Sequence, residues 1–191
     1  IIDDDSLPSI SINDVTVTEW NSGTANAVFT LSLSGASGQT ITVNYSTANV
    51  TATSGSDYVS TSGTLTFAPG VTSQTLIVTV NGDSLNEPNE TFVVNLSGAV
   101  NATIADNQGT GTISNDDPLP SIAINDVTVA EGNSGTTNAV FTVTLSPASS
   151  QAVTVNYATA DGSASAGSDY VGGSGTLTFA PGVTSQTINV S

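Results

Sequence analysis

Short runs in which apolar and polar residues alternate recur along this chain and predict β-strands. Residues 27–33 read AVFTLSL, and residues 40–47 read TITVNYST, so that Ile41, Val43 and Tyr45 fall on one face. No stretch keeps the three-to-four-residue spacing of an amphipathic helix. The pattern therefore indicates an all-β protein.

The first 117 residues contain enough of these runs to form a whole domain. Clusters of turn-forming residues separate them: NSG at 21–23, APG at 68–70, NG at 81–82 and NQG at 107–109. About seven strands with such spacing are typical of an antiparallel β-sandwich. Its core is expected to include Phe29, Tyr45, Phe67 and Phe92. The predicted strands are 9–13 with 15–18 as a broken first strand, 27–33, 40–47, 64–67, 75–80, 91–96 and 111–113, with 103 as an alternative start of the last strand.

The chain repeats itself at an offset of 112 residues. GTLTFAPGVTSQT at 63–75 returns unchanged at 175–187, and GSDYV at 55–59 returns at 167–171. A period of this length is a whole domain. We predict the tail of a preceding repeat at 1–7, a complete domain at 8–117, and a second domain at 118–191 that is truncated before its last strands. Trp20 has Gly132 as its counterpart, so we expect it to be an exposed loop residue.

Charge excludes several functions. The chain carries sixteen acidic residues and no Lys, Arg or His, giving a formal net charge of −16. Phosphate recognition needs basic side chains, so nucleic acid and anionic membranes are not expected partners. No apolar stretch predicts membrane insertion, and the start at Ile1 suggests an excerpt of a longer protein. Without His, Cys, Lys or Arg, the chain is also not expected to be an enzyme.

The loop at 81–90, NGDSLNEPNE, concentrates negative charge between two predicted strands. Asp83, Glu87 and Glu90 lie within eight residues. Their repulsion cannot be relieved by a basic side chain, because the chain has none. Calcium binds six to eight oxygen ligands in flexible geometry. The loop therefore predicts a calcium site, although a solvated polar linker remains the alternative for the acids near 115–117, and Glu90 could instead accept from backbone amides.

Six segments together resemble the Calx-beta family: VTVTEWNSG, TVNYSTA, GSDYV, GTLTFAPG, NGDSLNEPNETFVVNL and GTISNDD. The resemblance covers the whole chain. It implies tandem immunoglobulin-like sandwiches of about seven strands that bind calcium in loops at one end. The family occurs in the regulatory region of sodium–calcium exchangers, in integrin subunits and in repeat arrays of bacterial surface proteins.

The resemblance also implies a set of calcium ligands. Asn49 would contribute an amide oxygen where an acid is common, and Gly82 and Ser84 stand where exchanger domains have further acids, which suggests fewer or weaker ions. Asp14, Asp57, Asp126 and Asp169 are predicted to cap turns instead, and Asp3, Asp4 and Asp5 would belong to a preceding repeat's site. The implied ligands are Glu19, Asn49, Asp83, the Leu85 carbonyl, Glu87, Glu90, Asn115, Asp116 and Asp117, with Glu131 and Asp161 in the second copy.

These features predict a calcium-binding structural repeat of an extracellular bacterial surface or secreted protein. Calcium would stiffen the link at Pro118 and Pro120, and the partners would be neighbouring repeats in a stalk, adhesin or fibre. Affinities of about 10⁻⁴ to 10⁻³ M suffice for extracellular modules. The alternative is a calcium-sensing regulatory module, which the missing acids disfavour. The unfinished second domain could also accept strands from a neighbouring chain.

Overall fold

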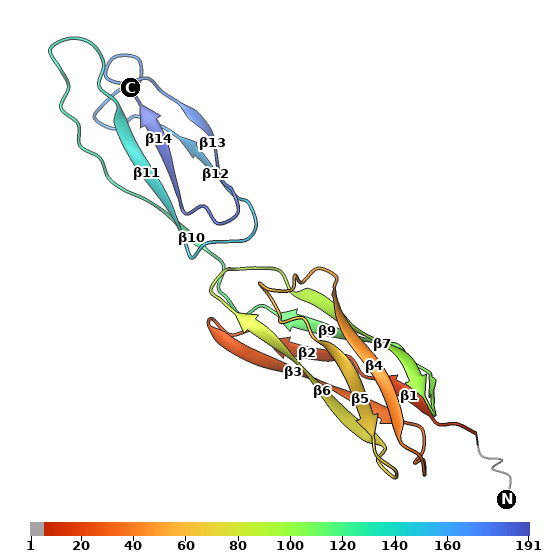
Figure 1. Ribbon diagram of the computed structural model, residues 1–191. Coiled ribbons are helices and arrows are strands. Elements are labelled where there is room, and N and C mark those ends of the chain that lie inside the picture. The colour runs from red at the N-terminus through yellow and green to blue at the C-terminus, as the bar shows by residue number, and fades with distance from the viewer. Residues whose placement is uncertain (1–5) are drawn as a thin grey trace, which may run out of the picture. The chain divides into compact units, whose positions relative to one another are not determined.

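The computed structural model describes residues 6–191, in which every regular element is a β-strand (Figure 1). Residues 1–5, with the expected preceding-repeat acids Asp3, Asp4 and Asp5, lie outside the described part. The chain divides into two compact units, the first holding strands β1–β9 and the second β10–β14. The predicted all-β fold class is correct. Within residues 6–191 no helix is long and apolar enough to cross a membrane.

The first unit is a sandwich of two sheets (Figure 1). One sheet has the order β6-β3-β1-β8 and the other β2-β9-β7-β4-β5. The strands are β1 (Ser9–Ile12), β2 (Val15–Thr18), β3 (Gly23–Leu33), β4 (Ile41–Asn49), β5 (Ser62–Phe67), β6 (Ser73–Gly82), β7 (Glu90–Val100), β8 (Thr103–Ile104) and β9 (Gln108–Ser114).

The predicted break in the first strand is where the chain passes from one sheet to the other. β1 pairs with β3, whereas β2 pairs in parallel with β9. Asn13 Oδ1 accepts a hydrogen bond from the Thr30 amide of β3 at 2.6 Å, and Asp14 Oδ1 accepts from the Thr110 amide of β9 at 2.7 Å. Asp14 thus has the expected structural role, but it binds a neighbouring strand instead of its own turn.

Several strands are longer than the alternation predicts, because each extends its partner. β3 and β6 pair continuously from Gly23 opposite Gly82 to Ser32 opposite Ser73. The alternation of 27–33 and 75–80 marked only the central part, where one face is buried. The proposed start of the last strand at 103 is instead a separate short strand, β8, which pairs with β1.

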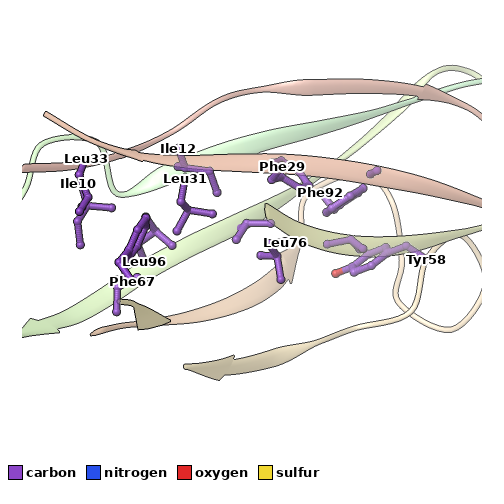
Figure 2. Close-up of a cluster of buried hydrophobic side chains, with 14 of the residues drawn as sticks. Ile10, Ile12, Phe29, Leu31, Leu33, Tyr58, Phe67, Leu76, Phe92 and Leu96 are labelled. Carbon is purple, nitrogen blue, oxygen red and sulfur yellow. The ribbon is translucent and has the colours of Figure 1, made fainter. Parts of the chain in front are cut away.

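The core of the first unit lies between the two sheets (Figure 2). Phe29, Phe67 and Phe92 are fully buried, and Tyr45 packs against them in part, as predicted. Phe92 of β7 stacks on Tyr58 at 4.5 Å between ring centroids and meets Phe29 of β3 edge-on at 6.0 Å. Phe92 therefore joins the two sheets to the loop that carries Tyr58.

The second unit repeats only part of this arrangement. Its sheets have the orders β10-β11-β14 and β12-β13. The small core holds Val143, Leu145, Phe179 and Ile188. Its strands are β10 (Ser121–Ile124), β11 (Ala139–Ser146), β12 (Val153–Ala158), β13 (Ser174–Phe179) and β14 (Ser185–Val190).

Candidate metal centre

Backbone contacts bring the ends of several strands of the first unit to the same place. The Glu19 amide, just after β2, donates to the Ser114 carbonyl at the end of β9 at 3.1 Å. The Asn115 amide donates to the Asn89 side chain of the β6–β7 loop at 3.1 Å. Elements far apart in sequence thus converge around the acidic loop, as the resemblance implies.

The loop between β4 and β5 reaches the same end of the sandwich. The Asn81 amide in β6 donates to the Asp57 carbonyl at 2.9 Å. Asn81 Nδ2 donates to the Ser56 carbonyl at 2.8 Å. The residues around Asp57 are therefore tied to the strand that leads into the acidic loop.

Asp57, Glu87 and Glu90 form a carboxylate cluster. One oxygen of each lies within 4.8 Å of the others, and all three side chains are half-buried. Three negative charges at this spacing repel strongly where water is partly excluded. No basic side chain exists in the chain to offset them. Such oxygens suit a hard cation such as calcium.

Asp57 was expected only to cap a turn. It does so, since Asp57 Oδ2 accepts from the Thr53 amide at 2.6 Å. Its place in the cluster was missed because it depends on how residues 50–59 fold back against β6. The motif GSDYV, present in both repeats, was the available signal, but on its own it did not separate a ligand from a cap.

Glu19 and Asp117 are buried carboxylates, only 5% and 6% exposed. Burying a carboxylate is costly unless hydrogen bonds or a cation compensate it. Asp83 and Asp116 are exposed, while Leu85 and Asn115 are half-buried. Within residues 6–191 the cluster joins only Glu87 and Glu90 of the predicted ligands with Asp57. The other assignments remain predictions.

Asn49 has a structural role that the resemblance does not imply. Its Oδ1 accepts from the Tyr58 hydroxyl at 2.6 Å and from the Ser54 amide at 3.0 Å. Both lone pairs of the amide oxygen are thereby engaged. Burial raises the pKa of Tyr58, and the negative charge of Asp57 adds to this. Ligation of calcium by Asn49 would have to replace one of these hydrogen bonds.

Asp161 occupies the same position in the second unit and makes the same contacts. Its Oδ1 accepts from the Tyr170 hydroxyl at 2.7 Å and from the Ala166 amide at 2.8 Å. These hydrogen bonds, the Tyr170 bond first, lower the pKa of Asp161. The same bond raises the pKa of Tyr170, and burial adds to it. Glu131 is exposed, and among the described residues neither it nor Asp161 belongs to the carboxylate cluster.

Asp161→Asn should therefore let Tyr170 ionise at a lower pH than in the unchanged chain. The asparagine keeps an acceptor, as Asn49 does, but loses the charge that holds the phenol proton. Folding lowers the pKa of Asp161, so ionised Asp161 stabilises the folded state at pH values above its ordinary pKa of 3.8. This stabilisation is lost as the pH falls through the lower pKa of the folded state. The variant, which has no carboxylate here, should not show this loss of stability in acid. Tyrosinate absorbance measures the first effect and acid unfolding the second. Asp106→Asn is the control and should change neither; an unaltered tyrosine titration in Asp161→Asn would contradict the assignment.

Close packing around Gly82 accounts for the absence of an acidic side chain at this position. A Cβ placed there would overlap the backbone carbonyl of Trp20. Trp20 itself is 58% exposed, as predicted, so its backbone and not its ring makes this close approach. The sequence alone suggested only that a calcium ligand is missing at Gly82. The structure adds a reason: the backbone of Trp20 leaves no room for a side chain at this position.

Gly82→Ala should consequently lower the free energy of unfolding by about 1–3 kcal/mol, the usual cost of overpacking. The obstacle is backbone, which cannot rotate away as a flexible side chain could. Urea unfolding followed by the fluorescence of Trp20, the only tryptophan, measures the change. Gly38→Ala is the control, because a Cβ at Gly38 meets nothing within 4 Å. Equal stability of the two variants would refute the close approach.

The chain contains two sheets packed face to face, and this arrangement occurs once in full and once in part. Acidic loops lie at the end of the complete copy. These features define a tandem immunoglobulin-like β-sandwich protein. The model of the Calx-beta domain matches residues 3–117 and again residues 114–191. The chain therefore belongs to the Calx-beta family.

Solved structures agree with this fold. The crystal structure of CBD12 from CALX1.2 is 24% identical, covers 95% of this chain and 75% of its own, and has a TM-score of 0.53. The calcium binding domain CBD12 of CALX1.1 is also 24% identical, with 94% and 74% covered and a TM-score of 0.52. The apo form of the Calx CBD1 domain is 26% identical over 59% of this chain and all of its own, with a TM-score of 0.51. Among curated proteins, none matches.

Proposed function

We propose that the chain is a calcium-binding structural repeat of an extracellular surface or secreted protein. The observation that carries this proposal is the carboxylate cluster of Asp57, Glu87 and Glu90 in a chain without any basic side chain. The residues present thus offer the oxygen ligands that calcium requires.

The chemistry of the proposed site is charge neutralisation and cross-linking of loops. Asp57 holds the β4–β5 loop to β6 through its own backbone carbonyl, so a cation bound by its carboxylate and by Glu87 would fasten two loops together. Glu90 begins β7 and would connect the ion to the sheet. The role is one of binding and rigidity, not of catalysis.

The proposed mechanical role follows from where the acidic loops lie in sequence. Asn115, Asp116 and Asp117 lead directly into Pro118 and Pro120, which already restrict the backbone. Binding of calcium to these three residues would order the backbone that enters the link. An array of such repeats would then serve as a stiff spacer, stalk or fibre at the cell surface, where millimolar calcium occupies sites of about 10⁻⁴ to 10⁻³ M.

Small-angle scattering of residues 1–191 tests this role. With millimolar calcium the chain should scatter as a stiffer particle than with chelator, and the Glu87→Gln/Glu90→Gln variant should keep the chelator profile in both. Profiles that do not respond to calcium would count against the stiffening role.

A calcium-sensing regulatory module is the second candidate function. The observation in its favour is that the calcium binding domain CBD12 of CALX1.1 matches 94% of the chain in fold. A sensor requires the scattering change to be complete at micromolar calcium. A change that needs millimolar calcium favours the structural repeat, which is the outcome we expect.

A further inference from the structure

Asn81 and Gly82 form the only Asn-Gly sequence in the chain. Such a pair is typical of a turn. Both residues nevertheless belong to the end of β6, where they pair with Thr24 and Gly23 of β3. The pair therefore does not serve here to reverse the chain, and the side chain of Asn81 has another role.

The side-chain amide of Asn81 holds the loop between β4 and β5. Nδ2 donates to the Ser56 carbonyl at 2.8 Å and to the Gly55 carbonyl at 3.3 Å. The backbone amide of Asn81 donates to the Asp57 carbonyl of the same loop at 2.9 Å. Three consecutive loop residues thus bind one residue of β6, and the last of them carries a carboxylate of the cluster.

An acidic side chain at position 81 could not replace this amide. An ionised carboxylate only accepts hydrogen bonds, and the loop presents two carbonyl oxygens, which also only accept. Attraction would become repulsion between oxygens at the place where Nδ2 now donates. The added negative charge would also remain uncompensated by any basic side chain, because the chain has none.

Asparagine followed by glycine is also the pair that converts to an acid most readily, because glycine has no Cβ to hinder ring closure. The backbone nitrogen of Gly82 attacks Cγ of Asn81. A C–N bond forms, the side-chain nitrogen leaves as ammonia together with the proton of the Gly82 amide, and a succinimide ring results. Water then opens the ring at either carbonyl. The products are aspartate and isoaspartate, and water is the only co-reactant.

We infer that Asn81 is a site of spontaneous deamidation and that the reaction loosens the loop that carries Asp57. In the folded chain Gly82 pairs with Gly23, and the Asn81 amide is engaged by the loop. The reaction therefore proceeds from molecules in which this end of β6 has opened locally. Either product lacks the donor that holds the loop, and isoaspartate also lengthens the main chain of β6.

The expected change is local and affects the carboxylate cluster. Tyr58 remains stacked on Phe92, so residues 53–57 should loosen while the core keeps its packing. Asp57 would then no longer be held beside the other two carboxylates of the cluster, which lie on different elements. Deamidation would thus change the geometry of the cluster irreversibly as the protein ages.

Ageing of the full chain in chelator at mildly alkaline pH, followed by peptide mapping, tests the reaction without any contribution from calcium. Aspartate and isoaspartate should appear at Asn81 in the folded chain, and at least about tenfold faster in urea, where the hydrogen bonds to the loop are absent. The exposed Asn21, which precedes a serine, is the internal reference. An Asn81 that stays intact while Asn21 converts, or that converts equally fast in both solvents, would overturn the proposal.

Hydrogen exchange of the Asn81→Asp variant, also in chelator, tests the consequence. Exchange in residues 53–57 should be at least about tenfold faster than in the unchanged chain, as the loss of the amide's hydrogen bonds implies, while β3 stays unaffected. Asn81→Ala, which loses the donor but gains no charge, should lie between the two. The aged chain, fractionated by charge, should behave as Asn81→Asp does.

Asn107→Asp is the matched control, because it adds the same charge at an exposed position. It should exchange in residues 53–57 as the unchanged chain does. Unchanged exchange in Asn81→Asp and in the aged chain, or equal acceleration in Asn107→Asp, would overturn the role given to the Asn81 amide.

Discussion

Phe92→Ala should lower the free energy of unfolding of the first unit by about 3–5 kcal/mol, as full truncation of a buried phenylalanine does. Phe92 is completely buried and contacts one ring from the opposite sheet and one from the β4–β5 loop. Its removal leaves a cavity at the point where these three elements meet. Because Tyr58 follows Asp57, the variant should also loosen the loop that carries one carboxylate of the cluster.

Urea unfolding read from Trp20 fluorescence isolates this effect, since Trp20 is the only tryptophan and lies in the first unit. Phe179→Ala is the matched control: Phe179 is equally buried, but in the core of the second unit. It should leave the Trp20 transition in place. If Phe92→Ala lowers the free energy of unfolding by less than about 1 kcal/mol, the packing role assigned to Phe92 is contradicted.

Calcium should raise the melting temperature of the first unit by about 5–15 °C. At a ten- to hundredfold excess over the dissociation constant, ligand binding stabilises by about 1.4–2.7 kcal/mol, and each kcal/mol shifts the transition of a domain this size by several degrees. Glu87→Gln/Glu90→Gln should lose most of this shift, because two carboxylates of the cluster lose their charge. Thermal unfolding in calcium and in chelator measures both.

The same variant should be more stable than the unchanged chain in chelator. Without a cation the three carboxylates repel one another, and the neutral amides relieve this repulsion. The order of stability should thus reverse between chelator and calcium. Asp106→Asn, an exposed position away from the cluster, should follow the unchanged chain in both conditions. A variant that is less stable in chelator as well would show that Glu87 and Glu90 serve packing and not a cation.

The fold class could be predicted from the sequence because the main strands have a local pattern of alternating apolar and polar residues. Alternation in 27–33 and 40–47 marks the faces that are buried in β3 and β4. The acids of the 81–90 loop were evident for a similar reason, since they are neighbours in the chain. Strand ends were less predictable, because β3 and β6 extend each other beyond their apolar parts.

The missed features all depend on approaches between distant segments. Asp57 joins Glu87 and Glu90 only after the β4–β5 loop has folded against β6. Gly82 excludes a side chain because the Trp20 backbone passes over it, and Asn49 binds the Tyr58 hydroxyl nine residues away. No local pattern encodes these contacts, so the ligand set that the family resemblance implied did not include Asp57.

Isothermal titration of calcium into residues 1–191, beside the Glu87→Gln/Glu90→Gln and Asp106→Asn variants, tests the account most directly. We expect saturable binding with a dissociation constant of about 10⁻⁴ to 10⁻³ M in the unchanged chain and in Asp106→Asn. The double variant should bind at least about tenfold more weakly, having lost charge from two of the cluster's three carboxylates. Identical isotherms for all three proteins, or no binding heat in any, would contradict a calcium site at this cluster.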